Sequence, residues 1–252
     1  MSISRQDLKV VACVTAYNEE ATVGEIVRAL KACDAIDQVQ VVDDGSEDGT
    51  RAAAEAEGVK VISLETRVPV GQAIMRHLDD LDEECILLWC DADLVNLKPE
   101  YMADIVQRFK ATSLMQVMSS RGVPLNWPGF LRGWPIANLW GWFFGPISGE
   151  RAILKSDFQQ AITLAQSLEW EEMMRGYGIV LFLNWYSNVF GQGIEVRYFD
   201  QLRQRQKYQK WGRAAHLQMW RQWLQFGLCW LKIRVNGGKI KAKRQALLRH
   251  KD

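Results

Sequence analysis

The 252-residue sequence lacks any apolar run long enough to cross a membrane, which takes roughly 18 to 20 residues. Its longest apolar stretch, residues 179–190, is interrupted by three polar residues. A signal peptide is also not expected, because Arg5, Asp7 and Lys9 stand where an apolar segment would be needed. The sequence therefore predicts a cytoplasmic protein without a membrane-spanning helix.

Paired cysteine motifs are also missing. The five cysteines are odd in number and scattered, and none form the Cys-x-x-Cys spacing of zinc sites and redox motifs. We therefore expect reduced residues of the core. No Gly-x-Gly-x-x-Gly follows the first expected strand, which argues against a dinucleotide-dependent enzyme. The cysteines are Cys13, Cys33, Cys85, Cys90 and Cys229.

Acidic residues are nearly absent from the last fifth of the chain. Overall the sequence holds 31 Lys+Arg and 30 Asp+Glu, and its 48% hydrophobic content is that of an ordinary globular protein. Residues 1–200 hold 17 basic and 29 acidic residues, whereas residues 201–252 hold 14 basic residues and one acid, Asp252. This asymmetry predicts a basic C-terminal segment with a partner of its own, and no recognition motif indicates nucleic acid.

Strand and helix patterns alternate over the first 120 residues, which predicts an α/β fold with a mostly parallel sheet covered by helices on both faces. Continuous β-branched or apolar runs mark the strands, and apolar residues at helical spacing mark the helices. The expected strands are residues 9–15, 38–42, 59–64, 85–90 and 113–119, and the expected helices are residues 21–32, 51–57, 71–81 and 99–109.

The pattern changes after residue 120. Prolines and tryptophans crowd the next segment, residues 148–190 are expected to be mostly helical with a break near Gly176, and residues 193–199 to form a strand. Residues 201–235 favour a long helix ended by Asn236-Gly237-Gly238 and followed by a basic tail. The expected parts are a nucleotide-sugar-binding half (1–120), an acceptor-side half of the same domain (121–200), and a basic amphipathic helix with its tail (201–252). The crowded tryptophans are Trp127, Trp134, Trp140 and Trp142.

Polar clusters follow three expected strands, where ligands bind in open α/β sheets. Asp91 and Asp93, one residue apart, could hold a hard divalent cation, although such a pair also arises by chance in solvated loops. The turn at Asp43 and Asp44 could accept hydrogen bonds from a uracil or ribose, although Asp and Gly also favour turns without a function. The segment from Thr15 to Glu20 could equally be an ordinary helix start.

In this order and at these spacings, the three clusters resemble the nucleotide-sugar-binding half of GT-A fold glycosyltransferases, most of all family 2 and its relatives. The resemblance covers residues 9 to about 120 and implies a GT-A (Rossmann-like) fold, a nucleotide-sugar donor and Mg²⁺ or Mn²⁺. The implied nucleotide-binding residues are Ala16, Tyr17, Glu19, Asp43 and Asp44, and the implied metal ligands are Asp91 and Asp93, with Asp93 also counted as catalytic.

Weaker matches extend the resemblance. Residues 147–152 look like a Ser-Gly-x-Arg-Ala element of the acceptor side, whose relatives include enzymes that glycosylate glycerate-type acceptors; this gives Glu150 and Arg151 a catalytic role. Ser148 as a helix N-cap is the alternative. Before the third helix, Arg67 and Gly71 stand where relatives carry Gly-Lys-Gly, so both are assigned to the nucleotide site.

Two departures from the family limit the resemblance. Val180 stands where relatives carry a Glu after a Gly-Tyr-Gly segment, and no candidate for a catalytic base fits by spacing. Among the three histidines, His216 is the candidate third metal ligand, with a structural histidine as the alternative.

These observations predict a metal-dependent glycosyltransferase that moves a hexose from a nucleotide sugar, with a UDP-sugar as the first choice, to a lipid-linked or small polar acceptor. The alternatives are a catalytically impaired relative acting at a membrane surface and, with less support, a nucleotidyltransferase. Because residues 217–235 interleave tryptophan, leucine and basic residues, the helix favours an anionic membrane face over a packing helix with a solvated tail. A homodimer stays open.

Overall fold

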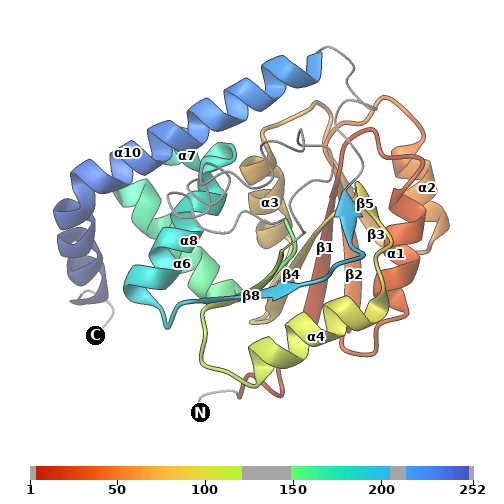
Figure 1. The fold of residues 1–252 in the computed structure, drawn as a ribbon, viewed down its shortest axis with the longest axis horizontal. Helices are drawn as coiled ribbons and strands as arrows, with labels where there is room; N and C mark the ends of the chain where they lie inside the picture. The colour runs from red at the N-terminus through yellow and green to blue at the C-terminus, as the bar shows by residue number, and fades with distance from the viewer. Residues whose placement is uncertain (1–3, 121–148, 205–213, 250–252) are drawn as a thin grey trace.

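The computed structural model describes residues 4–120, 149–204 and 214–249. It is an α/β fold around a seven-stranded, mostly parallel sheet of order β3-β2-β1-β4-β7-β6-β8, which confirms the predicted fold class (Figure 1). The strands are β1 (Val10–Ala16), β2 (Gln38–Asp43), β3 (Lys60–Ser63), β4 (Ile86–Asp91), β6 (Gln116–Ser120), β7 (Arg151–Leu154) and β8 (Ile194–Tyr198).

The alternation predicted for the first 120 residues is confirmed. Every expected strand and helix of this half is present within a few residues of its predicted bounds. The helices are α1 (Val23–Lys31), α2 (Thr50–Ala56), α3 (Val70–Asp79) and α4 (Pro99–Lys110). The helices α1, α3 and α4 each carry an apolar stripe that packs on the sheet; in α1 Val23, Ile26, Val27 and Leu30 are buried.

The expectation of helix from residue 148 onward is wrong at its start. Arg151–Leu154 form β7, which pairs antiparallel with both β4 and β6. The helix N-cap interpretation of Ser148 is therefore also wrong, because the residues that would follow it are a strand. Four residues carry little periodicity, and pairing with two neighbouring strands decides their conformation.

Helices follow from residue 155, and the break predicted near Gly176 is confirmed. They are α6 (Lys155–Ser167), α7 (Glu171–Arg175) and α8 (Gly178–Phe190). The predicted strand at residues 193–199 is also confirmed as β8, which lies parallel to β6. A small second sheet that the sequence did not predict joins β5 (Leu94–Val95) to β9 (Arg203–Gln204).

Two apolar clusters lie on the two faces of the sheet. On one face α1 and α4 cover alternate residues of the central strand β1, such as Val10, Ala12 and Val14. On the other face α3, α6 and α8 cover the intervening Val11 and Cys13. Because residues along a strand alternate in direction, the buried run in β1 supplies both clusters. The five cysteines are free thiols and are buried, as predicted for core residues.

The helix predicted over residues 201–235 is wrong at both ends. Arg203–Gln204 form strand β9, held by pairing with β5, and the C-terminal helix α10 (Ala214–Arg249) extends beyond residue 235. It continues through Gly237 and Gly238, and part of the expected tail is helical. Beyond the glycines Ile240 is fully buried and Leu247 packs against the same cluster as α8, so tertiary packing outweighs the cost of two helical glycines. Figure 1 shows α10 running past α7 and α8 and then changing direction near its end. In the described part of the chain, no helix is apolar and long enough to cross a membrane.

The burial of His77 on α3 is expected to make the stability of the fold fall at acid pH. Its ring is fully buried, and within the described residues neither ring nitrogen has a hydrogen-bond partner. Burial lowers its pKa from 6.5 to about 4; Asp80 opposes this shift and Lys60 adds to it. The unfolded chain therefore takes up a proton near pH 6.5 and the folded chain only near pH 4, so acidification between these values favours unfolding.

Acidification from pH 7 to pH 5 should lower the free energy of unfolding of both proteins. We expect this drop to be about 2 kcal/mol smaller in the His77→Leu variant than in the wild type. Urea titrations of both proteins at the two pH values measure the difference. Equal losses in the two proteins would mean that His77 is already protonated in the fold or that another group dominates acid unfolding.

Candidate functional site

The first two polar clusters lie side by side at the carboxyl edge of the sheet. Strand β1 ends at Ala16 and strand β2 at Asp43, and the pairing register places these two residues opposite each other. The Asp44 N–H then donates to the carbonyl oxygen of Ala16 at 2.9 Å. The first predicted loop and the aspartate turn are therefore joined through the backbone.

The third cluster adjoins them on the other side of β1. Asp91, the last residue of β4, pairs in register with Thr15, and the Ala92 N–H donates to the Thr15 carbonyl oxygen at 3.2 Å. Asp91 and Asp93 are partly exposed, whereas Ala92 between them is buried. The central strand thus brings two acidic pairs that are distant in the sequence to one edge of the sheet.

Polar contacts fix the loop after β1 against the turn after β2. The Asn18 N–H donates to Ser46 Oγ at 2.9 Å, and the Glu47 N–H donates back to Asn18 Oδ1 at 2.8 Å. Asn18 has a φ of 52°, a conformation that Asn tolerates better than most residues. The N–H of the buried Glu19 donates to Thr50 Oγ1 at 2.7 Å. Sequence reasoning missed Asn18, Ser46 and Thr50, although side chains of these types are frequent in such turns.

Asp44 combines burial with a hydrogen bond that favours its charge. Its carboxylate accepts from the Val68 N–H at 2.6 Å. Burial raises its pKa from 3.8 to about 6; the Val68 bond and the charge of Arg67 lower it, and neighbouring Asp43 raises it further. Asp43 is also buried and accepts from the Ser46 N–H at 3.1 Å. The turn therefore presents two carboxylates, one of which titrates close to neutral pH.

Arg67 reaches the first loop. Its guanidinium lies 4.2 Å from the centre of the Tyr17 ring, a cation–π contact between two residues predicted for the nucleotide site. Gly45 permits this approach: its φ is +67°, and a Cβ there would lie 2.7 Å from the backbone nitrogen of Arg67. The structure thus brings Arg67 together with Tyr17 and Asp44.

Gly71 has a structural explanation. It lies in the first turn of α3, and a Cβ on it would stand 2.0 Å from the Met174 carbonyl oxygen and 2.8 Å from that of Arg175. The absent side chain therefore lets the backbone of α7 pack on α3. Its predicted place in the nucleotide site stays a prediction.

Gly149 packs directly on Asp91, the last residue of β4. A Cβ on Gly149 would lie 2.1 Å from Asp91 Oδ2 and 2.5 Å from Oδ1. The acceptor-side element predicted from residues 147–152 therefore does meet the predicted metal site, through its glycine. The backbone of Gly149 leaves the Asp91 carboxylate little freedom to move toward it.

Glu150 and Arg151, next along the chain, are fully buried in a polar cluster beside the sheet. Ser119 Oγ donates to Glu150 Oε2 at 2.5 Å, and the Ser119 N–H donates to the Glu150 carbonyl oxygen at 3.0 Å. Arg151 Nη1 donates to Gln116 Oε1 at 2.9 Å and to Asn184 Oδ1 at 3.2 Å.

Electrostatics link Arg151 to Asp91. Burial lowers the Arg151 pKa from 12.5 to about 10, against the raising effect of Glu150 and then of Asp91. The buried guanidinium therefore lies close enough to Asp91 for the two charges to interact. The contacts of Glu150 and Arg151 are those of positioning residues, and their predicted catalytic role stays a prediction.

The donor set at this edge suits a hard cation. Asp91 and Asp93 supply carboxylate oxygens, which Mg²⁺ and Mn²⁺ prefer while keeping positions for water and phosphate oxygens. Among the described residues no group of three His, Cys, Asp or Glu is placed to hold a metal. His216 belongs to α10, but its side chain lies outside the described residues, as do Ser148 and Trp127, Trp134, Trp140 and Trp142.

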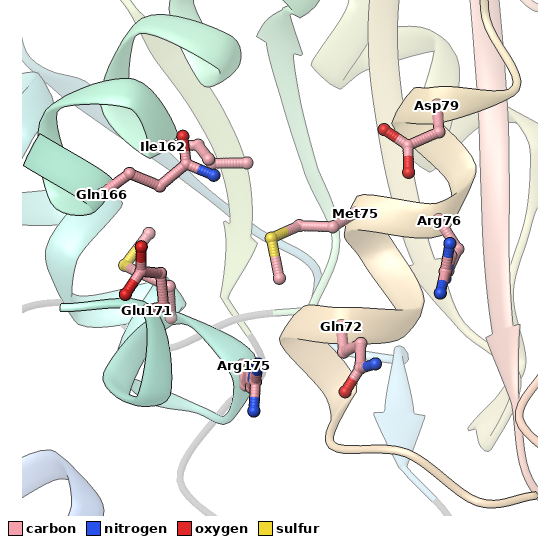
Figure 2. Close-up of a pocket in the computed structure, with 9 residues that line it drawn as sticks. Gln72, Met75, Arg76, Asp79, Ile162, Gln166, Glu171 and Arg175 are labelled. Atoms are coloured by element: carbon pink, nitrogen blue, oxygen red, sulfur yellow. The ribbon is translucent and has the colours of Figure 1, made fainter. Parts of the chain in front are cut away.

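A separate pocket of about 230 Å³ lies between α3, α6 and α7 (Figure 2). Glu171 lines it, whereas the neighbouring Glu172 forms an ion pair with Arg175 at 2.6 Å. The lining mixes acids, arginines and apolar groups. It consists of Gln72, Met75, Arg76, Asp79, Ile162, Gln166, Glu171, Met174 and Arg175.

A family model and individual relatives both indicate similarity to glycosyltransferases. Residues 11–154 match the family described as "Glycosyl transferase family 2". The chain is 29% identical over 114 residues to a glucosyl-3-phosphoglycerate synthase of Petrotoga mobilis and 32% identical over 100 residues to one of Mycolicibacterium smegmatis. The matched segments cover 40% and 36% of this chain but only 35% and 33% of those relatives, about a third of their length.

Solved structures extend the fold similarity to most of the chain. A glucosyl-3-phosphoglycerate synthase of Mycobacterium tuberculosis, in complex with Mn²⁺, UDP-glucose and phosphoglyceric acid, superposes with a TM-score of 0.65 at 21% identity. The superposition covers 88% of this chain and 81% of that one. A second structure of the same enzyme, with Mg²⁺ and UDP, has a TM-score of 0.63 and covers 84% and 77%.

Proposed function

Because the chain belongs to glycosyl transferase family 2, we propose that it transfers a hexose from a UDP-sugar, with Mg²⁺ or Mn²⁺, to a small phosphorylated acid such as phosphoglycerate. The main observation behind this proposal is that the three polar loops, which follow β1, β2 and β4, lie next to one another at the carboxyl edge of the sheet. Backbone pairing and hydrogen bonds hold Ala16, Asp43 and Asp91 together at one edge of the sheet.

In this proposal the aspartate turn holds the nucleoside. Carboxylates accept hydrogen bonds and carry negative charge, so Asp43 and Asp44 suit the uracil N–H or the ribose hydroxyls and not the phosphates. Arg67, held over the Tyr17 ring, brings a permanent positive charge to the same side. Asp93 and Asp91 hold the cation, which when bound neutralises charge on the departing diphosphate.

The acceptor is assigned by likeness to the relatives. Their names give a phosphoglycerate acceptor and UDP-glucose as the donor of the solved enzyme. In this chain Gly149 brings the acceptor-side element against Asp91, which supports an acceptor close to the cation. Arg151, a buried residue of that element, places a positive charge near Asp91.

Two predictions made from the sequence remain proposals with specific support. The exposed apolar residues of α10 support a lipid-linked acceptor at an anionic membrane face. The absence of an acid at Val180 supports a catalytically impaired relative that binds the nucleotide sugar without transfer. The contacts of the described residues add nothing to the nucleotidyltransferase alternative, and a homodimer remains a prediction.

Calorimetry and product analysis together test the proposal. UDP-glucose should bind only with Mn²⁺ or Mg²⁺, and mass spectrometry should detect a hexosylated product when 3-phosphoglycerate is added. Metal-dependent binding without any product would favour the impaired relative. A protein that binds no uridine nucleotide with either metal would overturn the proposal.

Asp44 predicts a pH-dependent affinity for the donor. With its pKa at about 6, the carboxyl is mostly ionised at pH 7 and mostly protonated at pH 5. Only the ionised form accepts the donor's hydrogen bonds with a full charge. We therefore expect the affinity for UDP-glucose to fall by up to about tenfold between pH 7 and pH 5.

The Asp44→Asn variant is the control, because its amide does not titrate. Its affinity should be lower at pH 7 and should change little down to pH 5. The measurement should use UDP-glucose and not UDP as the ligand, because the diphosphate of UDP-glucose has no group that titrates between pH 7 and pH 5. An equal pH dependence in both proteins would assign the titration to another group.

A further inference from the structure

Helix α10 carries apolar residues on two opposite faces. Its inner face packs on the body of the protein, with Cys229 and Ile233 buried. On its outer face four large apolar side chains are exposed, with relative accessibilities of 53% to 74%. We call them the outer stripe: Leu224, Leu228, Leu231 and Val235.

The spacing of the outer stripe is that of a single helix face. Its members recur at intervals of four, three and four residues, and at about 100° per residue they lie within a narrow sector. At the same angle Cys229 and Ile233 lie on the opposite side. Exposed apolar side chains that gather on one face, instead of being scattered singly, are typical of an interaction surface.

Basic residues border the outer stripe on both sides. Lys232 and Arg234 are exposed and lie at about 80° to either side of its centre. Lys232 lies over Trp170 at 5.6 Å and Arg234 over Trp230 at 5.2 Å, contacts that favour these positions. Residues 214–249 contain eight Lys or Arg and no Asp or Glu.

We propose that the outer stripe docks on an anionic lipid surface, with its apolar side chains among the acyl chains and the bordering basic groups at the lipid phosphates. A helix with an apolar face bordered by Lys and Arg has the form of an interfacial helix. A second copy of the chain is a poorer partner, because pairing two such helices would bring Lys and Arg against Lys and Arg.

The position of α10 gives this docking a consequence for the site. The small sheet β5–β9 lies directly after Asp93, and nine residues separate the end of β9 from the start of α10. Docking would therefore anchor to lipid the helix that follows, along the chain, the small sheet beside Asp93. Binding to lipid does not require the transferase activity, so the two proposals can fail separately.

Flotation with phospholipid vesicles tests the proposal on the full chain. The protein should float with vesicles containing phosphatidylglycerol and not with pure phosphatidylcholine, and about 0.5 M salt should release it. Replacing each basic residue of the border by Gln should weaken binding by about fivefold. The Leu228→Gln/Leu231→Gln variant should weaken it by roughly tenfold or more.

Tyr198→Gln is the matched control, because Tyr198 is 73% exposed and lies on β8, away from α10. It should float like the wild type. The Leu228→Gln/Leu231→Gln variant and the Tyr198→Gln variant should both keep the wild-type circular dichroism and Tm, because they replace exposed side chains. Absence of flotation, or equal flotation of the stripe variant, overturns the proposal. A wild type that is dimeric without lipid, together with a monomeric stripe variant, would assign the stripe to a second copy instead.

Discussion

Replacing Asp93 by Ala should reduce hexose transfer by at least about 10³-fold, equivalent to roughly 4 kcal/mol of transition-state stabilisation. The partly exposed Asp93 follows the end of β4 and, with Asp91, supplies the carboxylate oxygens proposed for the cation. Without this carboxylate the cation would bind less tightly. The diphosphate would then lack the positive charge that neutralises it, both in the bound donor and as it departs. Initial rates with UDP-glucose, Mn²⁺ and 3-phosphoglycerate measure the loss.

The fold should survive this change, because Asp93 lies beyond the strand and its side chain is not part of either apolar cluster. Thermal unfolding should therefore give a Tm within a few degrees of the wild type. Asp82→Ala is the matched control: this exposed acid lies at the amino end of β4 and should leave the rate unchanged. Turnover retained by Asp93→Ala would remove Asp93 from the metal site.

The first 120 residues were predictable because each element there has its own local signal. Buried parallel strands such as β1 appear as continuous apolar runs, and α1 shows its apolar face at helical spacing. The polar ends of β1, β2 and β4 could then be placed together, since parallel strands share a carboxyl edge.

What the sequence could not predict depends on tertiary partners. The four residues of β7 became a strand through pairing on both sides, and Gly237–Gly238 stayed helical because Ile240 beyond them is buried. The contact of Gly149 with Asp91 joins residues far apart in the chain, for which the sequence offered only a resemblance. Local propensity also gave no indication that Glu150 and Arg151 would be fully buried.

The acidic and basic residues of the chain belong to different parts of the fold. The acidic part contains both carboxylate pairs at the sheet edge, where we propose that a cation binds. The basic part is largely α10, whose outer stripe and borders suit an anionic surface. The near-zero net charge is thus the sum of an acidic part and a basic part, for which we propose different partners.

Replacing Gly149 by Ala should reduce transfer by about 10² to 10³-fold without removing any functional group. The new methyl group would stand 2.1 Å from Asp91 Oδ2, a distance that no native contact allows, so the carboxylate must rotate away. Metal-dependent binding of UDP-glucose should weaken in parallel, because a ligand misplaced by about 1 Å no longer has the orientation that the cation needs. Gly238→Ala is the control: a Cβ there meets nothing within 4 Å, and the helix should gain about 0.5–1 kcal/mol.

A double-mutant cycle shows whether this effect passes through Asp91. If the methyl group added by Gly149→Ala acts only by displacing that carboxylate, Asp91→Ala combined with Gly149→Ala should be no slower than Asp91→Ala alone. Additive losses in the double variant would mean that Gly149 acts on the acceptor directly, since its backbone also leads into the strand that carries Arg151. The same cycle with Asp93→Ala separates the two ligands: there the losses should stay partly additive, because the atoms nearest the new methyl group all belong to Asp91.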